Sequence, residues 1–280
     1  MAELTRYGRL TPMPVPELPV FAVHAGRSFV VTGASTGIGR ATAELLAAEG
    51  ARVVITELPH ALPAAQEVAD RLGGTAAGVH VVPMDLADPA SIPEGVARSV
   101  GLLGRVDGWV NNAAIVRIRS AFDHTPADWQ AQFDVNVFGT FEATRLIGEH
   151  LAGAGGGSVV NVASDSGKKG HPDMVAYNAT KAAVINLTRS LAEEWAPLGI
   201  SVNCVCPGGV DTPMLDQVAD TFAGFTGGDR DDIFASMANE QLGRHVAPVE
   251  VARVISFLLS GAASAVRGQA INVDGGVLAS

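Results

Sequence analysis

Tyr177 and Lys181 stand four residues apart in this 280-residue chain, inside the predicted helix Ala176–Trp195. That spacing places both side chains on one helix face, about one turn apart. A phenol can move a hydroxyl proton when nearby positive charge lowers its pKa, and an ammonium group is such a charge. Ser164 directly follows the predicted strand Ser158–Ala163, where its hydroxyl could hold a substrate oxygen. The three residues suit hydride transfer to or from a carbinol, which needs a group that moves the hydroxyl proton.

A glycine-rich turn precedes the first predicted helix. It joins the predicted strand Ser28–Thr32 to the helix Ala41–Glu49 and reads Gly33-Ala34-Ser35-Thr36-Gly37-Ile38-Gly39. Glycines at a strand-to-helix turn let the backbone approach a pyrophosphate, and the helix N-terminus offers free N–H groups and a positive dipole end. The turn therefore predicts a dinucleotide site.

Glu57 follows the second predicted strand, Arg52–Thr56. An acidic residue at this place binds the adenosine ribose hydroxyls and repels the 2′-phosphate of NADP. No arginine follows, since the next residues are Leu58, Pro59 and His60, and Thr36 in the glycine turn is neutral. These features favour NAD as the cofactor.

Strand-like and helical stretches alternate along residues 28–280. The remaining predicted strands are Val79–Pro83, Gly108–Asn111, Ser201–Cys206 and Gln269–Val273, and the remaining predicted helices are Ala64–Leu72, Ser91–Leu103, Ala127–Leu151 in two pieces, and Pro248–Leu259. Such alternation predicts a single α/β domain, doubly wound, with a mainly parallel seven-stranded sheet and helices on both faces. Residues 1–27 form an extension, in which Pro12, Pro14, Pro16 and Pro19 block helix.

Composition excludes several classes of function. The formal net charge of -10 argues against a nucleic-acid surface, because phosphate binding needs a basic face. No apolar run reaches the length of a membrane span, and the N-terminus lacks the apolar segment of a secretory signal. The two cysteines, Cys204 and Cys206, predict buried free thiols on one strand face rather than a disulfide or metal site. We therefore expect a cytoplasmic protein without a metal.

The ordered motifs resemble the short-chain dehydrogenase/reductase family over about residues 28–276. Thr32–Gly39 matches the family's cofactor turn, Asp85-Leu86 the pair that contacts adenine, and Asn111-Asn112-Ala113-Ala114 the Asn-Asn-Ala-Gly segment. Asn136 then matches the structural Asn, Pro207–Thr212 the segment that closes over nicotinamide, and Val273–Gly276 the C-terminal signature. Ala114 replaces the usual glycine and adds one methyl group near the cofactor. Ser164, Tyr177 and Lys181 match the remaining catalytic positions.

The resemblance implies a Rossmann fold and a role for each matched residue. Tyr177 would be the acid/base, and Lys181 would lower its pKa and hold the nicotinamide ribose. Ser164 would orient the substrate oxygen, and Asn136 would hold a water that links Lys181 to solvent. The implied cofactor-binding set is Gly33, Ser35, Thr36, Gly37, Ile38, Gly39, Glu57, Asp85, Leu86, Asn112, Ala113, Ala114, Tyr177, Lys181, Pro207, Gly208, Val210 and Thr212. The resemblance also implies a homo-oligomer, a tetramer.

The substrate is expected under a lid of about residues 213–240, whose apolar side chains are Met214, Leu215, Phe222, Phe225, Phe234 and Met237. At helical spacing such residues more often pack than contact substrate. The loop Asp165–Asp173 is polar and would suit a polyol or sugar-derived alcohol. Arg117, Arg119, Lys168 and Lys169 could together receive a phosphate or carboxylate, or form a solvated charged surface.

Two alternatives stay open at this stage. One keeps the reaction and changes the substrate, to a 3-oxoacyl thioester or a cyclic or steroid alcohol. The other is a non-catalytic NAD-binding protein, which has no need of Asn136, Ser164, Tyr177 and Lys181. Outside the domain, the apolar tail Pro12–Val23 is unlike a solvated linker, so we expect it to dock on its own subunit or a neighbour.

Overall fold

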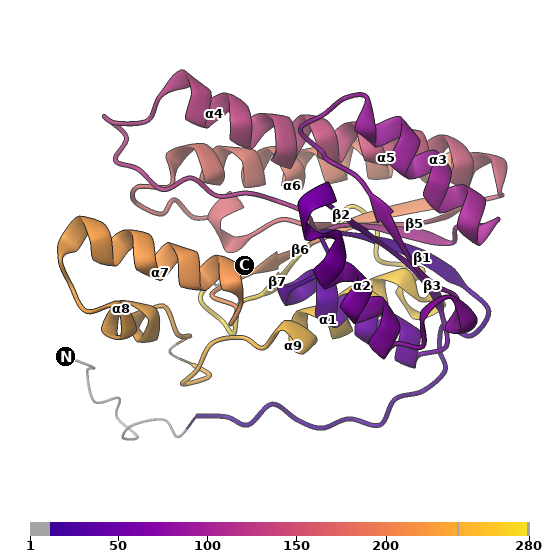
Figure 1. The fold of residues 1–280 in the computed structure, drawn as a ribbon, viewed down its shortest axis with the longest axis horizontal. Helices are drawn as coiled ribbons and strands as arrows, with labels where there is room; N and C mark the ends of the chain where they lie inside the picture. The colour runs from indigo at the N-terminus through magenta and orange to yellow at the C-terminus, as the bar shows by residue number, and fades with distance from the viewer. Residues whose placement is uncertain (1–11, 240, 279–280) are drawn as a thin grey trace.

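The computed structural model describes residues 12–239 and 241–278. Its centre is one seven-stranded sheet in the order β3-β2-β1-β4-β5-β6-β7 (Figure 1). Every neighbouring pair runs parallel, so the sheet is wholly rather than mainly parallel. The strands are β1 Ser28–Thr32, β2 Arg52–Glu57, β3 Val79–Pro83, β4 Gly108–Asn111, β5 Gly157–Val162, β6 Ile200–Pro207 and β7 Ala270–Val273.

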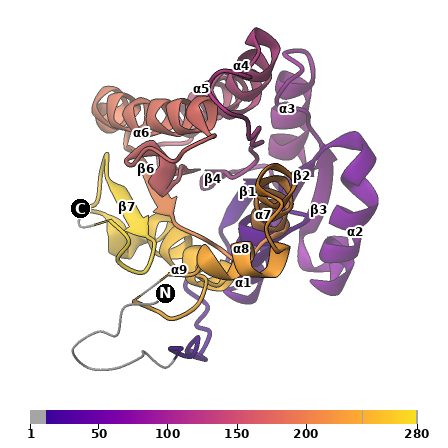
Figure 2. The same ribbon diagram turned by 90° about the vertical axis from the view of Figure 1, so that its left-hand side faces the viewer.

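Helices cover both faces of the sheet, which confirms the predicted doubly wound fold (Figure 2). One face carries α1 Gly37–Ala48, α2 Leu62–Arg71 and α9 Pro248–Leu259. The other carries α3 Ser91–Leu103, α4 Pro126–Phe133, α5 Thr140–Gly153 and α6 Val175–Trp195. None of the helices in the described ranges is long and apolar enough to cross a membrane.

The strands bury both of their faces. Successive strand residues point to opposite sides of a sheet, so Val31 packs toward α1, α2 and α9 while Val30 packs toward the helices opposite. Both residues are fully buried. Two-sided burial explains why the strands read as nearly continuous apolar runs. Cys204 and Cys206 are buried free thiols in one small cluster facing α6, as predicted.

The sheet reverses direction of winding at β1, which pairs with β2 on one side and β4 on the other. Ligands of open α/β sheets bind at the carboxyl ends of the strands beside such a switch point. Several strand ends there carry predicted site residues, including Glu57 on β2 and Ser164 after β5. The fold thereby gathers segments that are far apart in the sequence.

The predicted break in the helical stretch 127–151 is a π turn, Asp134–Gly139, between α4 and α5. Its wider winding interrupts the regular helix, and such π turns occur often at functional sites. Helix α4 begins at a capping box, in which Thr125 Oγ1 accepts from Asp128 N at 3.2 Å and Asp128 Oδ2 accepts from Thr125 N at 3.1 Å. Asn136 lies within the turn and is buried.

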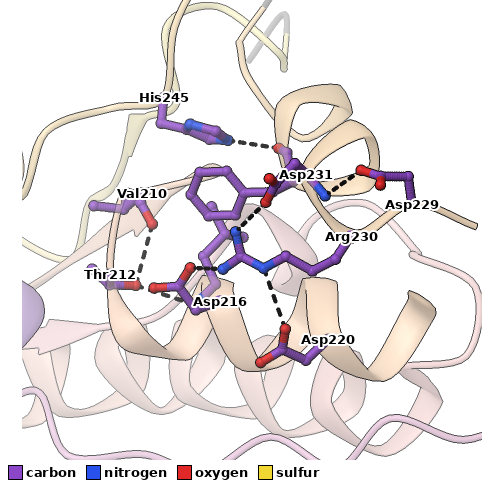
Figure 3. A network of polar contacts seen from close by, with 10 residues as sticks. Val210, Thr212, Asp216, Asp220, Asp229, Arg230, Asp231 and His245 are labelled. Carbon is purple, nitrogen blue, oxygen red and sulfur yellow. Dashed lines mark hydrogen bonds and ion pairs between the residues drawn. The ribbon is translucent and has the colours of Figure 1, made fainter. Parts of the chain in front are cut away.

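The lid consists of α7 Pro213–Thr226 and α8 Arg230–Ser236, which stand beyond the carboxyl edge of the sheet (Figure 1). Arg230 ties the two helices together (Figure 3). Its guanidinium bonds to Asp216, to Asp220 at 3.2 Å and to Asp231 at 3.0 Å. The predicted lid reached residue 240, which lies outside the described residues.

The tail residues 12–23 lie along their own subunit, which is one of the two predicted arrangements. Backbone atoms of the tail make the contacts, with Met13 N donating to Leu242 O at 2.9 Å and Pro16 O accepting from Arg253 Nη2 at 2.8 Å. The apolar side chains of Leu18 and Phe21 stay exposed. The predicted extension also covered residues 1–11, which lie outside the described residues.

Candidate active site

The glycine turn takes the shape that its residues predicted. Gly33 has φ of 61°, and a Cβ on it would lie 2.9 Å from the Cβ of Ala113. A Cβ on Gly39 would come within 2.5 Å of Gly33 O and 2.4 Å of Asn112 Nδ2. Both positions therefore require glycine, Gly33 for its left-handed backbone and Gly39 for the close packing of α1 on the turn.

The first turn of α1 keeps its backbone donors free for a ligand. Thr36 is the N-cap, and its side chain makes no capping bond. Unsatisfied N–H groups at a helix N-terminus, with the positive dipole end, form an anion site. The free donors and the absence of side chains on the glycines fit the pyrophosphate of a dinucleotide.

Thr32 holds the turn against the next loop, a role that the sequence reasoning missed. Its Oγ1 accepts from both Asn112 N and Ala113 N at 3.0 Å. Asn112 Nδ2 in turn donates to Thr32 O and Gly33 O, both at 2.9 Å. The side chain of Asn112 therefore fixes the cofactor turn. A threonine at a strand end next to a glycine turn was the only available signal.

Glu57 lies at the carboxyl end of β2, buried to 9% exposure. Its Oε2 accepts from Ser35 Oγ at 2.7 Å and Ser35 N at 3.2 Å. Its Oε1 accepts from Leu58 N at 3.0 Å. The carboxylate is thus held in one orientation at the place where the adenosine ribose of a dinucleotide would lie.

One cavity of about 890 Å³ runs from Glu57 to the lid. All the predicted cofactor residues except Gly39 line its wall. Ser164 lines the cavity too, whereas Asn136 does not. The predicted cofactor and catalytic residues therefore line one cavity, except Gly39 and Asn136, which do not reach its wall. We call the part of the cavity lined by the cofactor residues the cofactor trench.

Tyr177 and Lys181 lie side by side on α6, as their spacing predicted, with Lys181 Nζ 5.5 Å from the centre of the Tyr177 ring. Both are buried, and Lys181 Nζ donates to Val162 O at 2.9 Å. Burial lowers the pKa of Lys181 to about 8 and raises the pKa of the Tyr177 phenol above its ordinary value. We expected Lys181 to lower the pKa of Tyr177. Desolvation of the phenol is instead the largest cause of the shift, and the Lys181 ammonium is not among the groups that move the Tyr177 pKa.

Asn136 connects three parts of the site. Its Oδ1 accepts from Ile115 N at 2.8 Å, and its Nδ2 donates to Ile115 O at 2.9 Å and Thr180 Oγ1 at 3.2 Å. Both amide hydrogens are therefore used within the protein. The contacts position the loop after β4 against α6, and the proposed water-holding role stays a prediction.

Ser164 lies two residues after the end of β5, beside the phenol of Tyr177. Its Oγ accepts from Ser166 N at 3.1 Å and donates to Asp165 Oδ1 at 3.0 Å. These two bonds fix the rotamer of the hydroxyl within the cavity wall. An oxygen bound at this place would meet both Ser164 and Tyr177.

The cavity beyond Tyr177 has one apolar and one polar wall. Side chains from the loop after β4, from α6 and its approach, and from the lid form an apolar cluster of Val116, Ile118, Met174, Tyr177, Met214, Val218, Phe222 and Met237. Of the six apolar lid residues named from the sequence, Met214, Leu215, Phe222 and Met237 line the cavity, and Phe225 and Phe234 do not. The polar wall consists of Asp165, Ser166, Lys169 and His171.

The four cations Arg117, Arg119, Lys168 and Lys169 are not gathered at the cavity. Lys168 Nζ donates to Ala270 O at 2.7 Å and to Asn272 Oδ1 at 2.6 Å, at the edge of the sheet. Arg119 pairs with Asp128 at 3.2 Å. Arg117 and Arg119 do not line the cavity, and Lys169 does. Of the two alternatives left open for this set, their separate positions favour a solvated charged surface over a joint site for a phosphate or carboxylate.

Comparison with known proteins agrees with the geometry. Residues 33–278 match the family described as enoyl-(acyl carrier protein) reductase. The chain is 38% identical over 257 residues to cis-4-hydroxycyclohexanecarboxylate dehydrogenase of Sinomonas cyclohexanicum, covering 91% of this chain and 98% of the relative. It is 35% identical over 257 residues to the 3-oxoacyl-[acyl-carrier-protein] reductase FabG of Thermotoga maritima, covering 90% and 98%.

A solved structure extends the likeness to three dimensions. A variant of actinorhodin polyketide ketoreductase with NADPH superposes with a TM-score of 0.84 at 31% identity, covering 90% of this chain and 97% of that one. The fold, the cofactor trench and the matched family thus point to one oxidoreductase class that acts on alcohols and ketones with a nicotinamide cofactor. The chain belongs to the short-chain dehydrogenase/reductase family.

Proposed function

We propose that this protein is an NAD(H)-dependent enzyme that interconverts a secondary alcohol and its ketone, with Tyr177 as the acid/base. The observation that carries the proposal is the position of Ser164 and Tyr177, where the cofactor trench meets the apolar cluster under the lid. A carbinol bound there would have its hydroxyl beside the phenol and its apolar body against the lid.

Each residue of the site has a part in the reaction. The nicotinamide, when bound, supplies hydride transfer to and from the carbinol carbon. Ser164 holds the substrate oxygen, and the Tyr177 oxygen takes the hydroxyl proton during oxidation and gives it back during reduction. A positive charge on Lys181, whose Nζ lies 5.5 Å from the centre of the Tyr177 ring, would favour the ionised phenol.

The choice of NAD follows from Glu57. Bonds from Ser35 and Leu58 fix its carboxylate at the ribose end of the trench. A 2′-phosphate at that place would meet a buried negative charge. The related ketoreductase structure contains NADPH, so the preference proposed here depends on Glu57 and not on the family.

The apolar wall favours an alicyclic alcohol or ketone as substrate. Met174, Met214, Val218 and Phe222 surround the space next to Tyr177, and methionine adapts to rings of varied shape. A relative 38% identical over 257 residues is named for a hydroxycyclohexane carboxylate. Both features support a compact apolar ring that bears the reacting hydroxyl.

A polyol or sugar-derived alcohol is the second candidate. Asp165, Ser166, Lys169 and His171 also line this cavity and could bond to additional hydroxyl groups. The two candidates differ in which wall contributes most to binding.

A substrate panel separates these possibilities. NADH and NADPH absorbance would be followed with cyclohexanol-type alcohols, a sugar alcohol and the matching ketones, with a 3-oxoacyl thioester as a further arm. We expect the highest kcat/KM with NAD and an alicyclic alcohol or ketone. A higher kcat/KM for the sugar alcohol or the thioester would overturn the substrate class, and a higher value with NADP would overturn the cofactor.

A further inference from the structure

Asp165 directly follows Ser164 and has no part in the proton transfer proposed above. The residue is buried, with 11% of its side chain exposed, and it lies in the wall of the cavity. Burying a carboxylate is costly unless other groups compensate its charge. The partners of Asp165 therefore indicate what the carboxylate does.

One partner is the hydroxyl of Ser164. An ionised carboxylate can only accept hydrogen bonds, so in the 3.0 Å contact the Ser164 hydroxyl donates to Asp165 Oδ1. Ser166 N donates to the Ser164 oxygen at 3.1 Å. The remaining lone pair of that oxygen is left for the phenol of Tyr177 or a substrate hydroxyl. Because Asp165 accepts the only hydroxyl proton of Ser164, the Ser164 oxygen acts as a hydrogen-bond acceptor toward Tyr177 or the substrate.

The other partner is His171, whose Nε2 lies 3.5 Å from Asp165 Oδ2. The loop that carries His171 is fixed by two further contacts, because Asn178 Nδ2 donates to His171 O at 2.9 Å and Arg119 N donates to Asp173 O at 2.8 Å. Asp173 adopts φ of 60°, which is uncommon for a residue other than glycine. The loop is therefore shaped to hold His171 at the carboxylate.

The titratable groups around Asp165 come from three elements. Its own loop contributes Lys169 and His171, α6 contributes Tyr177 and Lys181, and β6 contributes Cys206 behind Ser164. Burial opposes ionisation of Asp165, but the contact with His171 and the hydrogen bonds from Ser164 and Ser166 together outweigh it and lower the pKa of the carboxyl group. After desolvation, the charge of Asp165 is a further cause that raises the pKa of Tyr177.

We propose that Asp165 and His171 are a positioning pair that orients the Ser164 hydroxyl and sets the electrostatic potential at the Tyr177 oxygen. The proposal rests on the role of Tyr177 proposed above. The negative charge of Asp165 keeps the proton on the phenol, and His171 moderates that charge. Such a pair adjusts the balance between alcohol oxidation, which needs the ionised phenol, and ketone reduction, which needs the protonated one.

Two substitutions act in opposite directions on the pH profile of alcohol oxidation. Asp165→Asn keeps an oxygen that can accept from Ser164 but removes the charge, so the rising limb of kcat should move to lower pH by about one unit. His171→Gln removes the partner of the carboxylate, so the limb should move to higher pH. A purely structural role would change Tm and kcat without moving the limb in opposite directions.

The matched control is Asp173→Asn, which removes a charge from the same loop at a residue that does not line the cavity. Asparagine also tolerates the positive φ of this position. Its pH profile should equal that of the wild type.

The outcomes separate the two proposals. Unshifted limbs in both Asp165→Asn and His171→Gln, alongside an inactive Tyr177→Phe, would overturn the positioning pair alone. Full activity in Tyr177→Phe would overturn the proposed function. If Asp165→Asn fails to fold, the direction of the His171→Gln shift decides.

Discussion

At the scale of single residues, the Glu57 carboxylate is expected to choose the cofactor through its charge. Glu57→Gln keeps the shape and removes the charge. The KM for NAD should rise roughly tenfold, because hydrogen bonds to a charged group are worth more than neutral ones. The KM for NADP should fall as repulsion of the 2′-phosphate is relieved. Steady-state kinetics with both cofactors would check this, and an unchanged NAD/NADP ratio would contradict it.

A second residue-scale prediction concerns His24, which is fully buried between the tail, α1 and α9. Its Nε2 lies 3.1 Å from Ser256 Oγ, and burial lowers the pKa of the imidazole from 6.5 to about 4. Because the unfolded chain binds the proton more readily, stability should fall as pH drops from about 6.5 to about 4, by at most about 1.4 kcal/mol per pH unit.

Glu49 works in the opposite sense. Burial raises the pKa of its carboxyl group, so its protonation in the folded state offsets part of the loss as pH falls. Thermal unfolding of the wild type and His24→Gln between about pH 7 and about pH 4 would measure the difference. The variant should have the flatter profile, and parallel profiles would show that His24 does not titrate on unfolding.

Sequence spacing alone could predict the positions of the site residues that belong to motifs. The Tyr177–Lys181 spacing, the glycine turn and the strand-end position of Glu57 each depend on local structure. The contact of Asp165 with His171 could not be predicted, because it depends on a loop that turns back at Asp173 with a positive φ. Thr32 was missed for a related reason, since its role depends on a neighbouring strand that is far away in the sequence.

At the scale of elements, ion pairs connect the two helices of the lid. Arg230 of α8 joins the two lid helices through two carboxylates of α7, Asp216 and Asp220 (Figure 3). Its Cζ lies 4.9 Å from the centre of the Phe234 ring. A single exposed ion pair contributes little to stability, so loss of the Arg230 pairs should loosen the lid only modestly. Arg230→Ala should therefore raise the KM for the alcohol by about two- to fivefold, while the affinity for NAD stays unchanged.

Arg105→Ala is a matched control for that variant. Arg105 also pairs with a carboxylate, Asp107 at 2.8 Å, but just before β4, away from the lid. Initial rates over a range of alcohol concentrations would compare the two variants. Equal KM values for Arg230→Ala and the control would show that the ion pairs do not hold the lid in its working position.

The elements themselves were predicted well where periodicity is strong. The strands and the helices packed on them agree with the sequence within a few residues, and the expected division of 127–151 falls at the π turn. The orientation of the lid helices could not be predicted, because their apolar residues serve both packing and cavity lining. Phe222 lines the cavity while Phe225, one turn later, is exposed.

At the scale of the whole molecule, we expect a homotetramer. Phe138 in the π turn and Phe141 at the start of α5 are exposed. Strand β7 pairs only with β6, so this edge of the described sheet is open. Exposed apolar groups and open strand edges are surfaces that association buries. Light scattering at micromolar concentration should give four times the chain mass of 28.8 kDa, and a monomer mass would contradict the prediction.

The most direct test of the central claim is the turnover of Tyr177→Phe with an alicyclic alcohol and NAD. The substitution removes only the phenolic oxygen and leaves the ring packed beside Lys181. If Tyr177 moves the hydroxyl proton, kcat should fall by roughly 10²- to 10⁴-fold, while the affinity for NAD, measured by titration, stays close to that of the wild type. A kcat near the wild-type value would contradict the assignment of Tyr177 as the acid/base.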